Sequence, residues 1–131
     1  MAEDTRRWIV DGMNVVGSRP DGWWEDPPAA MERLVRLLAA FAAEEAADVT
    51  VVFDGPQRQL EEEPRTDALR VVFAAERGAA EADDVIVDLA TESADSVRVV
   101  TSDRGLVGRL PARTEVIGAG GFRDRLEALA G

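Results

Sequence analysis

Three apolar runs in this sequence lead into an aspartate, either directly or after one residue. The aspartates are Asp11, Asp54 and Asp103, and the runs before them are residues 8–10, 49–53 and 97–101. A short apolar run bounded by turn residues is typical of a buried strand, and ligands of open α/β sheets bind at the carboxyl ends of the strands. We therefore expect these three carboxylates to meet at one edge of a single sheet.

A second acidic feature, Glu81-Ala82-Asp83-Asp84, begins a predicted helix. Two carboxylates about 4 Å apart repel by roughly 4 kcal/mol at an effective dielectric constant of ~20, so a group of them needs protonation or a cation near neutral pH. Mg²⁺ and Mn²⁺ suit such a site because hard ions prefer oxygen ligands. Two such ions about 3.5 to 4 Å apart can hold a phosphodiester, one activating water and the other stabilising the leaving oxygen. The pattern therefore predicts metal-dependent phosphodiester hydrolysis.

Each acidic residue also has a structural explanation. An aspartate after a strand is common as a turn residue or as a helix N-cap, and Asp83 and Asp84 in a first helical turn can complement the helix dipole. Asp84 lies opposite the apolar stripe of its helix, whereas Asp83 lies on the flank of that stripe. The functional interpretation depends on the joint occurrence of all these acids, which is much less expected than any one of them.

Several polar and aromatic residues near the same edge are candidates for substrate contact, namely Asn14, Ser102, Arg104, Arg19 and Arg58. Asn14 can cap the following segment or orient a water or phosphate, and Ser102 can satisfy backbone near the Asp103 turn or contact a phosphate. The arginines can clamp phosphates, although most arginines on such a surface are simply solvated. Trp23 and Trp24 can stack on an unpaired base or fix their loop onto the body of the protein.

The elements that must position these residues alternate along the chain. Strands are predicted at residues 8–11, 49–53, 69–73, 97–101 and 114–117, helices at 29–47, 80–92, 103–110 and 121–130, and exposed loops at 17–28 and 57–67. Nearly continuous apolar strands alternating with helices predict a parallel sheet covered on both faces. The expected fold is an α/β three-layer sandwich with a central, mainly parallel sheet of about five strands.

Composition limits the chemistry further. The 131 residues fit a single domain, and the absence of cysteine and histidine excludes disulfides, thiolate or imidazole metal sites and histidine-based catalysis. All 15 basic residues are arginines and the net charge is −11, which argues against tight nonspecific binding to long duplexes. The polar N-terminus lacks the apolar segment of a signal peptide and no run is long enough to cross a bilayer, so we expect no membrane association and a cytoplasmic location.

Four motifs in order resemble one known family. They are Ile9-Val10-Asp11-Gly12-Met13-Asn14, Val52-Phe53-Asp54-Gly55, Ala82-Asp83-Asp84-Val85 and Thr101-Ser102-Asp103-Arg104-Gly105. Together they resemble the NYN domain of the PIN-like nuclease superfamily, in particular its YacP-like branch, over almost the whole chain, residues 1–131. The resemblance implies a metal-dependent endoribonuclease that cuts single-stranded RNA with Mg²⁺ or Mn²⁺.

The resemblance also implies roles for individual residues. Asp11, Asp54, Asp83, Asp84 and Asp103 match the metal-binding carboxylates of the family, with Asp11, Asp83, Asp84 and Asp103 as catalytic residues and Asn14 as the accompanying polar residue. Related flap nucleases carry a second aspartate two residues after the last of these, where this chain has Gly105. Because few basic residues flank the acidic motifs, we expect the RNA to be presented by a larger assembly such as the ribosome. The alternative is a noncatalytic RNA- or ribosome-binding module of the same fold.

Overall fold

The structure is a computed structural model that describes residues 7–54, 68–78, 81–93 and 96–130. Its strands are β1 (Arg7–Asp11), β2 (Asp48–Phe53), β3 (Leu69–Phe73), β4 (Arg98–Val100) and β5 (Glu115–Ile117). Its α-helices are α1 (Gly12–Val16), α2 (Pro27–Glu45), α3 (Ala82–Glu92), α4 (Arg104–Val107) and α5 (Ala119–Ala130), and two 3-10 helices are η1 (Trp23–Glu25) and η3 (Ala74–Arg77). None of the described helices combines the length and the apolar character needed to span a membrane.

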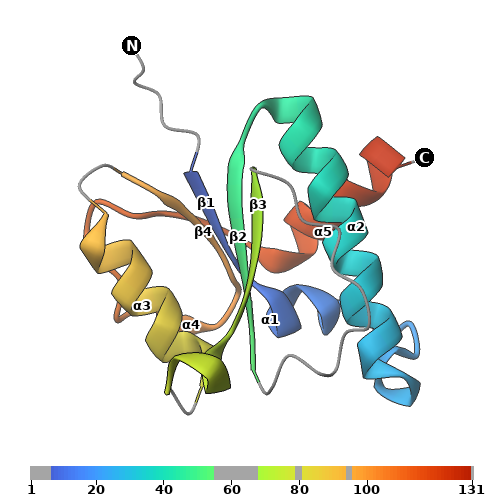
Figure 1. The fold of residues 1–131 in the computed structure, drawn as a ribbon, viewed down its shortest axis with the longest axis horizontal. Coiled ribbons are helices and arrows are strands. Elements are labelled where there is room, and N and C mark those ends of the chain that lie inside the picture. Colours follow the sequence, from blue (N-terminus) through green and yellow to red (C-terminus); the bar gives the residue numbers. More distant parts are fainter. Residues whose placement is uncertain (1–6, 55–67, 79–80, 94–95, 131) are drawn as a thin grey trace.

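The strands form one five-stranded sheet in the order β3-β2-β1-β4-β5, and all neighbouring pairs are parallel. Helices α2 and α5 lie on one side of this sheet and α3 and α4 on the other, which confirms the predicted three-layer α/β sandwich (Figure 1). The strand order reverses between β1 and β4. In open α/β sheets this switch point opens a crevice at the carboxyl ends of the two strands, where ligands bind.

The longest helix, α2, follows its sequence signals closely. Proline is tolerated in the first turn, and the helix begins at Pro27, where the Asp26 side chain accepts a hydrogen bond from the Ala29 amide at 3.2 Å. The apolar positions predicted to face the core are buried. The helix ends at Glu45, two residues earlier than predicted, because Ala46 adopts a left-handed conformation with a φ of 53°.

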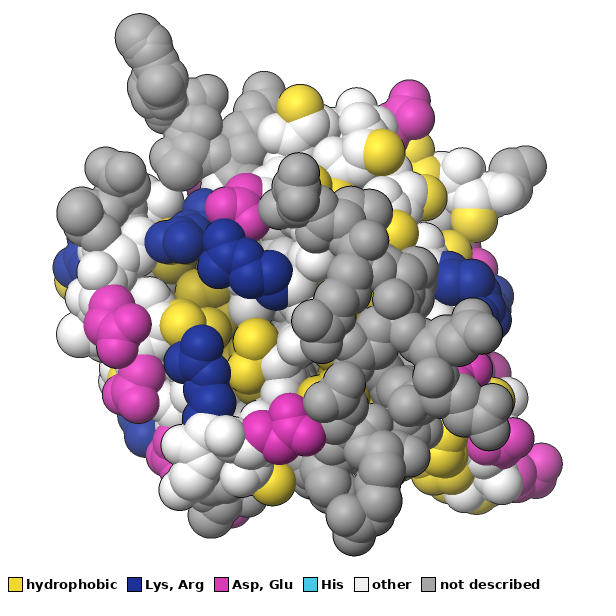
Figure 2. All heavy atoms as spheres, in the orientation of Figure 1, with side chains coloured by type: hydrophobic (Ala, Val, Ile, Leu, Met, Phe, Trp, Pro, Cys, Tyr) yellow, Lys and Arg dark blue, Asp and Glu magenta, His cyan; other side chains and the backbone are white. Residues whose placement is uncertain are grey.

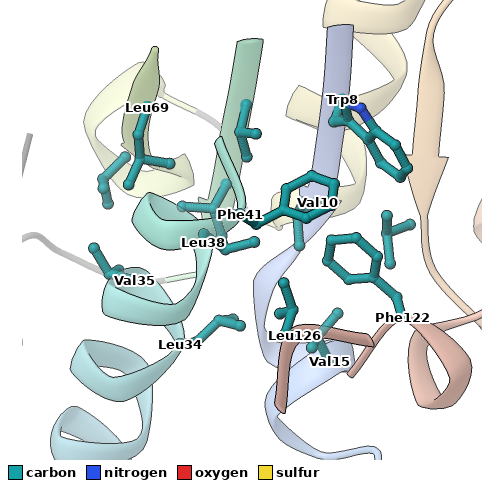
Figure 3. Close-up of a cluster of buried hydrophobic side chains, with 14 of the residues drawn as sticks. Trp8, Val10, Val15, Leu34, Val35, Leu38, Phe41, Leu69, Phe122 and Leu126 are labelled. Atoms are coloured by element: carbon teal, nitrogen blue, oxygen red, sulfur yellow. The ribbon is translucent and has the colours of Figure 1, made fainter. Parts of the chain in front are cut away.

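The core is divided by the sheet. On the α2 and α5 side, Trp8 packs against Phe41 and Phe122 with ring centroids 5.0 and 5.5 Å away (Figure 3). On the other side, Ile86 of α3 and Leu106 of α4 pack in a smaller cluster with strand residues that include Ile9 and Val99. Successive residues of β1 therefore face opposite layers, as expected for a strand buried on both faces.

Helix α1 was not predicted. Residues 12–16 were assigned to no helix or strand, but this segment turns into a helix immediately after Asp11. Gly12 allows the turn because a Cβ at this position would lie 2.5 Å from the Phe53 ring and 3.0 Å from the Val52 carbonyl oxygen. The predicted strand at residues 69–73 is confirmed, and η3 follows it. The loop predicted at residues 57–67 lies outside the described residues.

Gly12→Ala should destabilise the protein, because the added methyl group meets a ring that is fully buried in the core. Overpacking of this kind typically lowers the free energy of unfolding by about 1–3 kcal/mol, which urea denaturation followed by circular dichroism would measure. Gly120→Ala is the matched control because no atom lies within 4 Å of its added Cβ. Equal stability of Gly12→Ala and wild type would show that this close approach does not constrain the fold.

Candidate active site

Asp11 is the central carboxylate of the candidate site. It is the last residue of β1 and lies beside β4 at the switch point of the sheet. Only 6% of its surface is exposed, and its Oδ2 accepts a hydrogen bond from the Thr101 hydroxyl at 2.9 Å. The bond fixes one carboxylate oxygen, while Oδ1 takes no part in it. Asp11 therefore combines burial with a defined orientation.

Thr101 joins Asp11 to Asp103. Its hydroxyl donates to Asp11, and the same Oγ1 accepts a hydrogen bond from the Asp103 backbone amide at 3.1 Å. The residue is 1% exposed, so this hydroxyl is a buried link between the carboxyl ends of β1 and β4. Thr101 was not among the predicted site residues. The signal for it was a hydroxyl residue at the end of an apolar run, next to the Ser-Asp turn.

Burial and neighbouring charges act on the same carboxyl groups. Burial is the main cause that raises the pKa of Asp11 from its ordinary value of 3.8 to about 6, the Thr101 hydrogen bond opposes this rise, and the charges of Asp83, Asp54 and Asp103 add to it. Burial also raises the pKa of Asp83, followed by the charges of Asp103, Glu81 and Asp54. The predicted acids of β1, β2, α3 and α4 thus lie close enough to influence one another.

Three of the predicted acids also have structural partners. Asp54 Oδ1 accepts a hydrogen bond from the Ala82 amide at 2.7 Å, so the residue after β2 satisfies the first amide of α3. Asp103 is the N-cap of α4, and its Oδ1 accepts from the amides of Gly105 and Leu106 at 2.8 and 3.3 Å. Asp84 Oδ1 accepts from Arg109 at 2.9 Å. The N-cap explanation considered from the sequence therefore applies to Asp103, whereas the N-cap of α3 is Glu81.

Within the described part of the chain, no group of three or more acidic side chains is arranged to hold one metal ion. The carboxylates interact through their charges but do not form a ready-made cage. Mg²⁺ often binds through one or two carboxylates and keeps several waters.

Asn14 and Ser102 connect the site to the surrounding helices. Asn14 Oδ1 accepts a hydrogen bond from the Ser102 amide at 2.8 Å, and Ser102 Oγ accepts one from the Ala119 amide at 2.9 Å. Asn14 thus bridges α1 to the turn after β4, which differs from both roles considered for it. Ser102 satisfies the first amide of α5 rather than backbone at the Asp103 turn. Their predicted contact with substrate stays a prediction.

The two predicted phosphate-binding arginines that the structure describes do not lie together. Arg104 is exposed at the start of α4, Arg19 forms an ion pair with Asp124 of α5, and Arg58 lies outside the described residues. On the face shown in Figure 2, arginine side chains form separate groups among acidic ones. The structure therefore gives Arg104 a place beside Asp103 and gives Arg19 an acidic partner on another helix.

Asp11→Asn should stabilise the metal-free protein at pH 7.5. Because the pKa of Asp11 is raised to about 6 on folding, the folded state holds this proton more tightly than the unfolded chain, and stability falls as the pH rises from about 4 to 6. Removing the charge should raise the free energy of unfolding by about 1–3 kcal/mol at pH 7.5, from a shift of about two pKa units, and by almost nothing at pH 4. Urea denaturation at both pH values, with EDTA present, measures this.

The control for this prediction is Asp88→Asn, which removes an equal charge from an exposed position on α3. We expect no comparable gain in stability from it at either pH. A gain from Asp11→Asn of the same size at pH 4 and pH 7.5 would contradict the electrostatic explanation, because Asp11 is already protonated in the folded protein at the lower pH.

Comparisons with known proteins show the fold in solved structures. Two crystal structures of Rae1 (YacP) from Bacillus subtilis, one of them a tryptophan-to-leucine variant, have the same fold. The variant structure has a TM-score of 0.74, covering 96% of this chain and 77% of its own, and the other has a TM-score of 0.70, covering 94% and 74%. Both are 24% identical to this chain in sequence. No curated protein matches the sequence significantly.

The sequence profile of the YacP-like NYN domain matches residues 8–108, a segment that contains the switch point and all five predicted carboxylates. NYN domains have a PIN-like nuclease fold, and members of this group generally act as nucleases. This chain belongs to the family of YacP-like NYN domains.

Proposed function

We propose that this chain is a single-domain, divalent-metal-dependent endoribonuclease that cuts single-stranded RNA. The observation that carries the proposal is the buried carboxylate of Asp11, whose charge is opposed by burial and by three further aspartates at the switch point of the sheet. A group of carboxylates with raised pKa values is a favourable place for a cation, because the cation removes the repulsion between them. The family match supports RNA as the substrate.

The donor set fits a hard cation such as Mg²⁺ or Mn²⁺. Every candidate ligand is a carboxylate, and the chain has no histidine or cysteine to favour a softer metal. Asp11 together with Asp83 or Asp103 would hold the ion, with Asp54 beside them, whereas Asp84 is paired with Arg109. Because the described acids form no closed three-ligand group, the ion would keep waters and take further ligands from the RNA phosphate.

The chain contributes charge, orientation and a proton-accepting group. When bound, such an ion would supply an activated water and stabilise the leaving oxygen. Hydrogen bonds hold one oxygen each of Asp11, Asp54 and Asp103, so these carboxylates lose little freedom when they engage a cation. The raised pKa of Asp83 makes that carboxylate a better acceptor for a proton from water than an ordinary aspartate.

Surface charge supports a single-stranded substrate delivered by a larger assembly. The chain has a net charge of −11 and no lysine, and several described arginines are paired with acids, including Arg19, Arg33 and Arg109. Affinity for nucleic acid depends strongly on neutralising phosphates, so free RNA would bind weakly. We propose that an assembly such as the ribosome presents the RNA strand to the site.

The second candidate function is a noncatalytic RNA-binding module of the same fold. Two observations favour it, namely Gly105 at the position where related nucleases carry another aspartate, and the structural partners already held by Asp54 and Asp84. The two functions differ in turnover. Cleavage of RNA in molar excess over the protein would exclude the binding module.

Asp11→Asn should abolish RNA cleavage. With 5 mM Mn²⁺ and a labelled single-stranded RNA in excess, we expect wild type to turn over and Asp11→Asn to be slower by at least about 100-fold, as for loss of a group that stabilises developing charge. Asp88→Asn on the exposed part of α3 should keep wild-type activity. If wild type and Asp11→Asn both matched a protein-free control, the proposed activity would be wrong.

Thr101→Val should change the pH dependence of cleavage. Loss of the hydroxyl removes the hydrogen bond that lowers the pKa of Asp11, so this pKa should rise further above 6 and the acidic limb of the pH–rate profile should move to higher pH. Thr101→Ser keeps a hydroxyl and should restore the wild-type profile. An unchanged profile in Thr101→Val, with reduced activity at every pH, would indicate a purely structural role for Thr101.

A further inference from the structure

A pocket of about 250 Å³ lies beside α1, on the side of the sheet covered by α2 and α5. Residues from α1, from the segment before α2, from the first turns of α2 and from α5 line it. None of the five predicted carboxylates is among the lining residues. The pocket is therefore distinct from the acidic site, although α1 connects the two.

One wall of the pocket is apolar and includes an aromatic ring. Val16, Ala30, Leu34 and Leu37 provide aliphatic surface, and the half-buried Trp23 provides its indole. Figure 3 shows Leu34 on the first part of α2, near the edge of the main core. A flat ring that enters such a pocket can contact aliphatic groups and an indole at the same time. This wall suits a planar heterocycle.

The mouth of the pocket carries fixed hydrogen-bond acceptors. Asp21 Oδ2 accepts a hydrogen bond from the Arg123 guanidinium at 2.6 Å, and this bond is the main cause that lowers the pKa of Asp21, so its carboxylate stays ionised. Asp26, the N-cap of α2, adds a second carboxylate to the lining. A ligand that donates N–H groups would find acceptors already oriented.

The arginines of the pocket are committed to protein acceptors. Arg123 is 6% exposed and donates to Glu127, to the carbonyl oxygens of Val15 and Val16 and to Asp21. Arg33 donates to both oxygens of Glu127 at 2.9 and 3.1 Å. Because these cations are already paired with carboxylates or carbonyl groups, the pocket favours a neutral ring with donors over a phosphate.

We propose that this pocket binds an unpaired nucleobase that carries an amino group, in the RNA strand whose phosphate occupies the acidic site. The inference rests on the proposed ribonuclease function. Adenine, guanine and cytosine present an amino group with two N–H donors, and carboxylates pair with such groups, whereas uracil has no amino group and presents only one imide N–H. Helix α1 begins next to Asp11 and ends at Val16 in the pocket wall, and its five residues rise by only about 8 Å. One strand can therefore reach both sites.

The binding test uses nucleosides and no metal. Cytidine, adenosine and uridine are titrated into ¹⁵N-labelled protein with EDTA, and the indole N–H of Trp23 and the amide of Ala30 are followed by NMR. We expect saturable shifts with cytidine and adenosine and at least fivefold weaker binding of uridine. Absence of shifts at Trp23, or equal binding of uridine, would overturn the inference.

Two variants of α2 test whether the NMR shifts caused by nucleosides come from binding in this pocket. Ala29→Phe fills the pocket from an exposed lining position and should abolish the shifts, whereas Ala43→Phe adds the same side chain at an exposed position on α2 away from the pocket and should not. Unchanged melting temperatures would establish that both variants fold. Equal nucleoside binding by the two variants would contradict the assignment to this pocket.

Cleavage measurements separate this inference from the proposed function. In an active enzyme, Ala29→Phe should raise KM for a cytidine-containing RNA at least fivefold with kcat within twofold of wild type, and Ala43→Phe should change neither. If the protein binds cytidine at Trp23 but cleaves no RNA, the proposed nuclease function is wrong and the pocket is still a base-binding site. If the protein cleaves RNA but its Trp23 signal does not change with nucleosides, the base-binding pocket is wrong and the proposed nuclease function stands.

Discussion

The central constraint on this structure is the carboxylate of Asp11, whose negative charge is disfavoured by burial and by neighbouring aspartates. Asp11 ends the central strand of a parallel sheet, is almost completely buried, and lies near three other aspartates at the switch point. The hydrogen bond from the Thr101 hydroxyl offsets part of the energetic cost of burying the ionised carboxylate. Burial of an ionised group is destabilising, so the proposed divalent cation would relieve an energetic cost that the folded chain otherwise carries at Asp11.

The surrounding acids combine structural and electrostatic roles. Asp54 accepts a hydrogen bond from the first amide of α3 and Asp103 is the N-cap of α4, so the same carboxylates that repel Asp11 also stabilise the starts of these helices. Helix N-termini carry partial positive charge, which stabilises nearby carboxylates by typically a few tenths to 1 kcal/mol. The helices thus lower the repulsion without removing it. This balance leaves the acidic edge intact in the free protein and still favourable for a divalent ion.

Much of this arrangement could be predicted from the sequence, and the exceptions have physical reasons. The apolar runs before Asp11, Asp54 and Asp103 predicted the strands and their shared edge, because a strand buried on both faces needs continuous apolar residues. Helix α1 was missed because its only signal is five residues long and its β-branched Val15 and Val16 favour a strand. The Thr101 link and the pocket beside Trp23 depend on contacts between distant segments, which local patterns do not encode.

The most direct test of the central claim is crystallography of the protein soaked in Mn²⁺, with anomalous differences measured to locate the ion. The account predicts an anomalous peak at the carboxyl ends of β1 and β4, ligated by Asp11 together with Asp83 or Asp103. Absence of this peak in a crystal grown near pH 7.5 with several millimolar Mn²⁺, or a peak only elsewhere on the surface, would contradict the account.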